Sequence, residues 1–248
     1  MTPQVKHVRS AEVAWEPLGT HGLRRKVLGF DPRDQHVTAL VDIPVGWRGG
    51  GIAHYHHAFE EVFMLSGSVT VGGTHYWHAG DYFYRPADIV HGHDERSEEG
   101  TLAVIRSDGP LELLLIHDPD EPDEYPRSGP ISDPRGHILQ IPTGARPWID
   151  SPDLPEGWRV KPLSADAESG ARTMMIRIPQ GWSGDTGAGR DTAWEALILN
   201  GSLRNETRQF DEGDYCSGPA GVEVFDIRST DAGCELLVWQ FARDRIIA

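Results

Sequence analysis

The residues with the clearest capacity for chemistry in this sequence are two histidines, His54 and His56, which stand two positions apart. Side chains at positions i and i+2 of a strand point to the same face, so the two imidazoles would lie close enough to chelate one ion. Glu60 follows beyond a turn that can fold its carboxylate back, and His91 begins a later segment after Pro86. Three neutral imidazoles and one carboxylate suit a borderline divalent ion such as iron(II), zinc, nickel or manganese, and not calcium.

Neighbouring residues compete for these roles. Glu61 is the rival of Glu60, but alternation along a strand places it on the opposite face, so Glu60 is the preferred ligand. His57 alternates away from the histidine pair, and we expect it on an exposed turn or behind the ligands. His93 shares the parity of His91 and is a candidate for contact with the substrate or for support of a ligand.

Further side chains are candidates to line a pocket around the ion. Each has an ordinary alternative role, in the core or in a surface ion pair. By strand parity the candidates are Met64, Tyr82, Tyr84 and Arg106. Two more histidines, His75 and His78, lie on an expected hairpin and are predicted to be exposed.

The chain also repeats itself, which predicts two tandem copies of one domain. A shift of 135 residues aligns the segment from Gly22 to Trp47 with the segment from Gly157 to Trp182, and shifts of 134 and 133 then align Gly67 with Gly201 and Gly80 with Gly213. Further matches join Ile105-Arg106-Ser107 to Ile227-Arg228-Ser229 and Glu112-Leu113-Leu114 to Glu235-Leu236-Leu237.

The second copy lacks the candidate ligands, because no histidine follows His137. In the alignment His54 falls on Ala188 or Gly189, His56 on Arg190 or Asp191, and Glu195 stands opposite Glu60 or Glu61. Seven residues separate Pro219 from Ile227, whereas eighteen separate Pro86 from Ile105, which predicts that the segment equivalent to His91 is deleted. We therefore expect a metal-free second copy with a structural role.

Short segments rich in β-branched residues and bounded by glycine or proline predict an all-β chain. Glycine and proline together supply 46 of the 248 residues, which favours many turns. The expected division is a first domain at residues 1–117, a proline-rich acidic linker at 118–156 with one strand near His137–Ile141, and a second domain at 157–248.

The joined pattern, HxHxxxE followed by Gly67 and then Gly80-Asp81-Tyr82 with Pro86 and His91, resembles the two signature motifs of the cupin superfamily. The resemblance implies two tandem jelly-roll barrels, a bicupin, with His54, His56, Glu60 and His91 as ligands inside the mouth of the first barrel. It covers residues 22–116 and 157–241, and the second copy departs from it at every histidine.

Because such barrels host many chemistries, the fold does not name the reaction. The leading hypothesis, by resemblance to cupin oxygenases, is a mononuclear non-haem metal dioxygenase that acts on a small enolisable, aromatic or diketone-like substrate, with iron(II) favoured. Glu60 would then accept a proton from the substrate. An alternative is an isomerase, cyclase or lyase that uses zinc or nickel as a Lewis acid. A third is a non-catalytic metal- or ligand-binding sensor, since zinc cupins attached to anti-sigma factors share the HxHxxxEE spacing.

The composition narrows the choice of partners to a small molecule. Lys and Arg minus Asp and Glu gives 23 − 38 = −15, and so acidic a surface repels nucleic acid and anionic membranes. The first ten residues hold no apolar segment typical of a secretion signal, so a cytoplasmic location is expected. Two cysteines cannot form a disulfide framework. A monomer or a homodimer is expected, because the second barrel can replace the partner of a cupin dimer.

Overall fold

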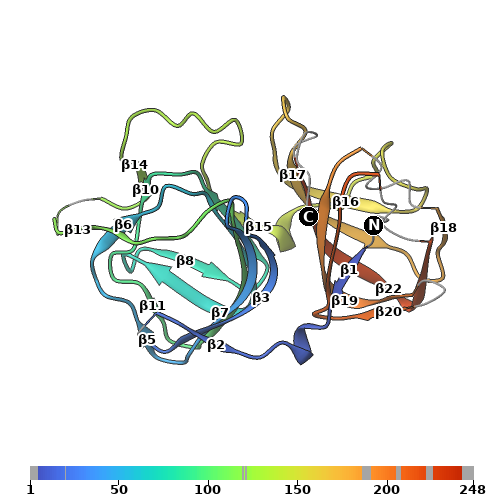
Figure 1. Cartoon of the computed structure of the whole chain (residues 1–248), viewed down its shortest axis with the longest axis horizontal. Coiled ribbons are helices and arrows are strands. Elements are labelled where there is room, and N and C mark those ends of the chain that lie inside the picture. Colours follow the sequence, from blue (N-terminus) through green and yellow to red (C-terminus); the bar gives the residue numbers. More distant parts are fainter. Residues whose placement is uncertain are drawn as a thin grey trace. The chain divides into compact units, whose positions relative to one another are not determined.

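The computed structural model describes residues 5–19, 21–118, 120, 122–185, 191–204, 208–221 and 226–241. These residues form strands, turns and two short 3-10 helices, with no α-helix among them. In this part of the chain no helix is long and apolar enough to cross a membrane. The chain divides into two compact units, which we call the N-terminal barrel (14–145) and the C-terminal barrel (1–13 and 146–248) (Figure 1). The prediction of an all-β chain with two barrels is confirmed.

The N-terminal barrel is built around one large sheet and several short pairs of strands. Its strands are β2 (Glu16–Leu18), β3 (Leu23–Asp31), β4 (His36–Ile43), β5 (Trp47–Arg48), β6 (Ala53–Tyr55), β7 (Glu60–Val71), β8 (His75–His78), β9 (Asp81–Arg85), β10 (Ile89–Val90), β11 (Arg96–Ser97), β12 (Thr101–Ser107), β13 (Leu114–Ile116), β14 (Tyr125–Pro126) and β15 (Ile138–Pro142), and the 3-10 helix η2 (Thr143–Ala145) follows. The order in the large sheet is β15-β9-β7-β12-β4-β3-β2. The long strand β7 also pairs with β8 and β11, while β6 pairs with β13 and β10 with β14.

The C-terminal barrel repeats this plan with a second sheet in the order β1-β21-β19-β22-β17-β16. Its elements are β1 (Lys6–Val8), the 3-10 helix η1 (Ser10–Glu12), β16 (Arg159–Ala165), β17 (Arg172–Ile178), β18 (Ser183–Asp185), β19 (Trp194–Arg204), β20 (Gln209–Asp211), β21 (Tyr215–Gly218) and β22 (Asp226–Gln240). Strands β18 and β20 pair with β22 and β19.

The same glycine contact occurs in both barrels and supports the predicted duplication. Gly67 and Gly201 have φ values of 74° and 77°, a left-handed conformation that favours glycine. A Cβ at Gly67 would lie 1.8 Å from the carbonyl oxygen of Gly100, and one at Gly201 would lie 2.2 Å from that of Gly233. Two strands therefore cross at the same close approach in each copy, and only glycine fits there.

The strand register corrects the end of the predicted alignment. Arg106 pairs with Thr38 and Glu61, and Trp239 pairs with the equivalent residues Thr173 and Glu195. Arg106 therefore corresponds to Trp239 and not to Arg228. On this register Ile105 corresponds to Val238, and eighteen residues separate Pro219 from Val238, as they separate Pro86 from Ile105. The predicted deletion is wrong, because short Ile-Arg-Ser and Glu-Leu-Leu matches misled the alignment.

The compact units divide at different residues from the predicted domains. Strand β1 pairs with β21, so the first 13 residues belong to the C-terminal barrel. Strands β14 and β15 pair with β10 and β9, so the predicted linker as far as Ala145 belongs to the N-terminal barrel. Such long-range pairing replaces exposed backbone by sheet hydrogen bonds, and local composition does not reveal it.

Candidate metal centre

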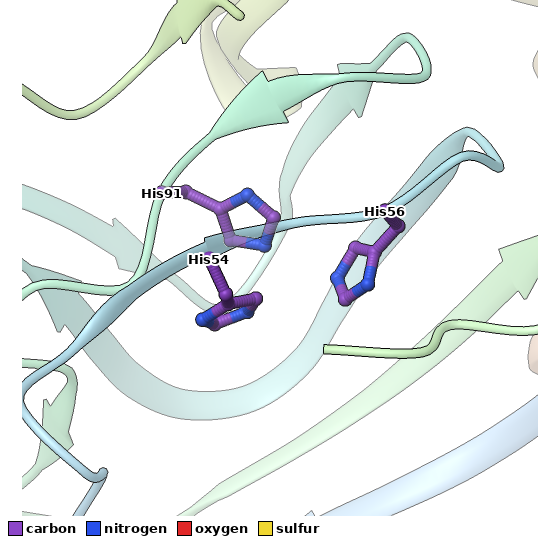
Figure 2. Close-up of side chains that lie close together, drawn as sticks. All are labelled: His54, His56 and His91. Atoms are coloured by element: carbon purple, nitrogen blue, oxygen red, sulfur yellow. The ribbon is translucent and has the colours of Figure 1, made fainter. Parts of the chain in front are cut away.

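Three histidines converge in the N-terminal barrel because two short segments pair beside each other. His54 lies in β6, and its amide donates to the carbonyl oxygen of His91 at 2.7 Å, while the His91 amide donates back to His54 at 2.9 Å. His56 follows β6 by one residue and shares the parity of His54. The ring centroids lie 5.2 Å apart for His54 and His56, 4.4 Å for His54 and His91, and 5.1 Å for His56 and His91 (Figure 2).

The three imidazoles form a group able to hold one ion. One nitrogen from each lies within 4.8 Å of the others, and the three side chains are buried. No other such group of histidine, cysteine or acidic residues occurs in the described part of the chain. Gly92 makes room for the group, since a Cβ there would lie 2.4 Å from Nδ1 of His54.

Backbone carbonyls orient two of the rings. Nδ1 of His56 lies 2.9 Å from the carbonyl oxygen of Glu112, and Nδ1 of His91 lies 2.9 Å from that of Ile89. A carbonyl only accepts, so Nδ1 carries the proton in both rings and Nε2 keeps its lone pair. Metal-binding histidines are typically held in this way by a partner behind the ring.

His54 and His91 stay neutral at neutral pH. Burial lowers the pKa of His54 to about 4, with a further contribution from His56, and Glu60 opposes this shift. Burial also lowers the pKa of His91, and the positive charge of Arg85 adds to the effect. A neutral imidazole is the form that binds a metal, so these two residues can bind an ion without first losing protons.

Glu60 lies beside the histidine group and is bound to an arginine. Nη1 of Arg85 donates to Oε2 of Glu60 at 2.7 Å, and the same oxygen is 3.6 Å from Nε2 of His91. The close group of ligand atoms does not include Glu60. Burial alone would raise the pKa of Glu60, but Arg85 and then His56 lower it overall, so the carboxylate is ionised. Glu61 is further from this role, because it lies on the other face of β7.

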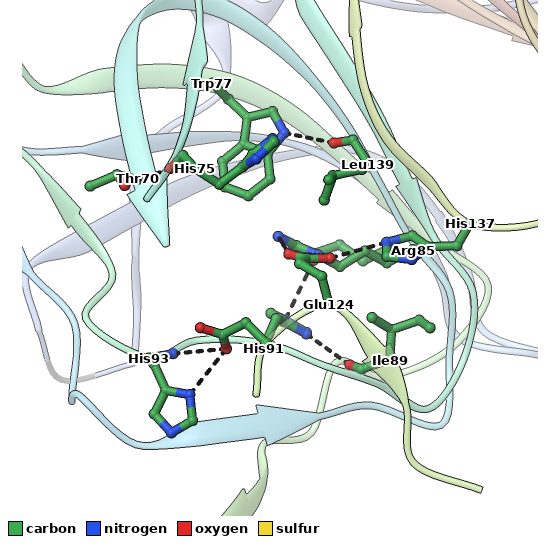
Figure 3. Close-up of polar contacts among 12 residues, drawn as sticks. Thr70, His75, Trp77, Arg85, Ile89, His91, His93, Glu124, His137 and Leu139 are labelled. Carbon is green, nitrogen blue, oxygen red and sulfur yellow. Dashed lines mark hydrogen bonds and ion pairs between the residues drawn. The ribbon is translucent and has the colours of Figure 1, made fainter. Parts of the chain in front are cut away.

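A buried chain of polar contacts continues from Arg85 (Figure 3). Its guanidinium also donates to Glu124 at 2.7 and 3.0 Å, and Oε2 of Glu124 lies 3.0 Å from Nε2 of His137. Burial would raise the pKa of Glu124, but Arg85 and His137 bring it to about 2. Both Glu124 and His137 come from the segment that the sequence predicts to be a linker, and the acidic run around Glu124 is not only a solvated surface.

Two further acidic residues of this region were not predicted. Asp123 accepts hydrogen bonds from the amide and Nδ1 of His93 at 3.3 and 3.2 Å, so His93 is supported from the same segment as Glu124. Burial raises the pKa of Glu95 to about 7, and Glu60 adds to the shift while Arg85 opposes it. No motif singles out Glu95, because its burial depends on how the loop before β11 folds.

Only one of the residues predicted from parity to line the pocket faces the same side as Glu60. Met64 is 1% exposed and packs with Val62, Phe83 and neighbouring apolar residues on that side. These side chains form an apolar wall, and the cross-strand register places them in the same layer as the pair formed by Glu60 and Arg85.

Tyr82, Tyr84 and Arg106 lie on the opposite face, which corrects the prediction for them. Tyr84 and Arg106 are cross-strand partners of Glu61, and Tyr82 donates to Oε1 of Glu61 at 2.7 Å. Arg106 donates to Oε2 of Glu61 at 3.0 Å, and Tyr84 donates to Asp133. The parity argument failed because alternation along one strand does not give its register with the next strand. In the observed register, the odd-numbered residues of β9 lie on the same side of the sheet as Glu60.

The remaining histidines lie away from the group. His57 is exposed and its Nδ1 lies 2.7 Å from Asp88, in agreement with the expectation of a turn. His78 is exposed as predicted, whereas His75 is half-buried, with its ring centroid 4.5 Å from that of Trp77.

The C-terminal barrel has an apolar interior where the N-terminal barrel has the polar site. Trp194 and Gly218 are cross-strand partners at the positions of Glu60 and Arg85, and Trp194 is 1% exposed within the apolar core. The register makes Glu195 the counterpart of Glu61 and not of Glu60, which resolves the alternative left open by the sequence. Of the expected counterparts of the ligands, Ala188, Gly189 and Arg190 lie outside the described residues, and Asp191 is exposed.

Comparison with known proteins agrees with the duplicated fold. The family model described as the ChrR cupin-like domain matches residues 3–112 and 138–242. No curated protein sequence matches the chain. A structure from Nostoc punctiforme described as a “putative dioxygenase” is similar over 100% of this chain and 86% of its own, with a TM-score of 0.79 and 16% identity.

Two other solved structures are similar along most of their length. The nickel(II) complex of the pirin YhhW from Escherichia coli has a TM-score of 0.58 at 13% identity, over 96% of this chain and 99% of its own. The formate complex of oxalate decarboxylase from Lactobacillus farciminis has a TM-score of 0.60 at 13% identity, over 97% and 87%. At these identities the likeness shows the fold.

Proposed function

Because this chain belongs to the family of ChrR cupin-like domains, we propose that its N-terminal barrel is a metal-dependent oxidoreductase centre of the dioxygenase type. The observation that carries the proposal is the group of three buried imidazoles at His54, His56 and His91, of which His54 and His91 have lowered pKa values. The Nostoc punctiforme structure described as a “putative dioxygenase” supports the same class of reaction.

The donor set fits one divalent transition metal. Nitrogen donors with free lone pairs suit iron(II), zinc, nickel or manganese, whereas calcium takes oxygen ligands. Iron(II) is favoured in this proposal, since such an ion, when bound, polarises a substrate oxygen and supplies electrons to dioxygen. His56 and His91 would hold it through Nε2, while their Nδ1 atoms keep their protons and donate them in hydrogen bonds to the backbone carbonyl oxygens of Glu112 and Ile89.

The residues around the histidines favour a small, enolisable or aromatic substrate. Val62, Met64 and Phe83 supply an apolar wall. Glu60, the carboxylate nearest to His91, would accept the substrate proton. Because Arg85 helps to keep the pKa of Glu60 low, the Glu60 carboxylate accepts a proton only from an acidic hydroxyl. Enols and phenols satisfy that condition better than simple alcohols do.

A Lewis-acid reaction at the same site is the second candidate. Neutral histidines bind zinc or nickel as readily as iron(II), and the structural neighbours include a nickel(II) complex and oxalate decarboxylases. An isomerase, cyclase or lyase would use the same ligands and the same apolar wall, but it would consume no oxygen.

Anaerobic loading followed by oxygen measurement tests the proposal. The protein is loaded separately with iron(II), manganese, nickel or zinc, mixed with a panel of enols, phenols and diketones, and monitored for oxygen uptake. We expect uptake with iron(II) that H56A and H91A abolish, while H78A, which removes an exposed histidine, retains it. Full zinc occupancy after gentle isolation, with substrate conversion and no oxygen uptake, would favour the Lewis-acid reaction instead.

A further inference from the structure

Arg85 is hydrogen-bonded to Glu60, the carboxylate that lies beside the histidine group in the described part of the chain. Its Nη1 donates to Oε2 of Glu60 at 2.7 Å, and the two side chains are 5% and 13% exposed. A hydrogen bond between two charged groups in a buried setting is among the strong ones in proteins. Oε2 is therefore committed to the arginine, although it lies only 3.6 Å from Nε2 of His91.

The arginine itself has little freedom to move. Glu124 binds the other side of the guanidinium through hydrogen bonds of 2.7 and 3.0 Å. The guanidinium carbon lies 4.4 Å from the centre of the Phe83 ring and 5.2 Å from that of Trp77, distances typical of cation–π contact. Glu124 is in turn bound to His137. The guanidinium is therefore held by Glu60, by the rings of Phe83 and Trp77, and by Glu124.

We propose that Arg85 is a positioning residue that holds Glu60 back from the ion, so that three histidines bind it and coordination positions stay open for a substrate. The inference rests on the proposed function, because it needs an ion at the histidines. It goes further by stating that Arg85 limits how Glu60 can coordinate the ion. Glu60 reaches the ion through its remaining oxygen or not at all. Without Arg85, Glu60 is free to bind with both oxygens and to close a position.

Cobalt(II) is a suitable probe, since its visible absorption reports the number and type of ligands without any turnover. The affinity and the visible bands are measured for the wild type, R85M, E60Q and the double variant E60Q/R85M. R106M is the matched control, because Arg106 also forms a buried pair with a glutamate, Glu61, at 3.0 Å, but on the opposite face. R85K keeps the charge and, with a single ammonium group, cannot hold both Glu60 and Glu124.

We expect R85M to bind cobalt(II) about tenfold more tightly than the wild type, with altered visible bands, as Glu60 becomes a ligand. R85K should shift both readouts in the same direction by a smaller amount, which keeps the test valid if R85M does not fold. E60Q should change affinity less than about threefold in the wild-type background and more than about tenfold in the R85M background. R106M should resemble the wild type.

Three results would contradict this account in different ways. Affinity and bands of R85M and R85K equal to those of R106M would show that Arg85 does not restrain Glu60. A loss of affinity in R85M as large as that in E60Q would show that Arg85 presents Glu60 to the ion. A wild-type protein that binds no cobalt(II) would overturn the proposed metal function as well, which separates the failure of the function from that of this inference alone.

Discussion

Where the N-terminal barrel carries Glu60 and Arg85, the C-terminal barrel carries Trp194 and Gly218. In each barrel the two residues are cross-strand partners on neighbouring strands. The flanking pairs match as well, with Phe63 opposite Tyr82 and Leu197 opposite Tyr215. The backbone frame is therefore the same, and the contents of the interior differ at this point.

In the C-terminal barrel the indole of Trp194 fills the space that the charged pair of Glu60 and Arg85 occupies in the N-terminal barrel. A Cβ at Gly218 would lie 2.8 Å from Cζ2 of Trp194, so the glycine is needed for the indole to fit. A buried indole has one polar group, its N–H, whereas the charged groups of a buried pair have several donors and acceptors to satisfy. One copy thus has an interior suited to stability, and the other has one suited to binding.

The opposite face of the same strands changed less between the copies. Glu61 and Tyr82 have Glu195 and Tyr215 as their counterparts. The two barrels thus differ at the compared positions on the side of Glu60, whereas the opposite, buried face keeps a glutamate and a tyrosine and changes elsewhere, from Arg106 to Trp239 and from Tyr84 to Ser217. Metal binding should accordingly depend on residues that only the N-terminal barrel has.

The largest expected effect follows from removing one ligand imidazole at a time. H56A and H91A should each reduce the affinity for zinc at least about a hundredfold, since even residues behind metal ligands are worth about 10–100-fold. Competition with a chromophoric chelator measures the affinity. H78A is the control and should bind as the wild type does. Equal binding by all four proteins would mean that the ion lies elsewhere.

The next effect concerns the C-terminal barrel. W194A should destabilise the protein by about 3–5 kcal/mol, because the lost indole leaves a cavity in a packed core. Denaturant unfolding measures the free energy, and zinc affinity should stay within about twofold of the wild type because Trp194 has no counterpart among the ligands. A loss of stability below about 1 kcal/mol would show that the core collapses around the gap.

Acid should weaken the ion-free protein through the N-terminal site. The pKa of His54 is about 4 in the folded chain against 6.5 for an ordinary histidine. Between these values the unfolded chain binds more protons, so stability is greatest above pH 6.5 and falls as the pH drops toward 4. The slope reaches at most about 1.4 kcal/mol per pH unit for this histidine.

The His91 pKa is lowered in the same direction and should steepen the decline. Denaturant unfolding at a series of pH values, with chelator present, measures it. H54Q removes one titrating group and should flatten the slope. An unchanged slope in H54Q would assign the acid sensitivity to other residues.

The pair of His54 and His56 was predictable because strand alternation places both side chains on one face. His91 was joined to them through the resemblance to the cupin motifs, since its bridge to His54 connects distant parts of the chain. Most strands followed from similar short-range patterns. The pair formed by Arg85 and Glu124 was not predictable, because Glu124 reaches Arg85 only after a segment read as a linker folds back.

Register was the second limit of the sequence. Alternation shows which side chains of one strand share a face, but it does not show which face of the next strand adjoins them. Tyr82 and Tyr84 were therefore placed with the ligands, although β9 turns Phe83 and Arg85 toward Glu60. The predicted domain boundaries failed for a similar reason, since β1 pairs with a strand about 200 positions away in the chain.

The smallest expected effect tests whether the buried face opposite Glu60 contributes only to stability. Y82F removes the hydroxyl that donates to Glu61 at 2.7 Å, while Arg106 still binds the same carboxylate at 3.0 Å. We expect a loss of about 1–2 kcal/mol in unfolding free energy, because a buried acceptor loses one of its donors. Zinc affinity and the cobalt(II) bands should not change, since the hydroxyl points away from the histidines. A shift in either readout would mean that the two faces of the sheet are coupled.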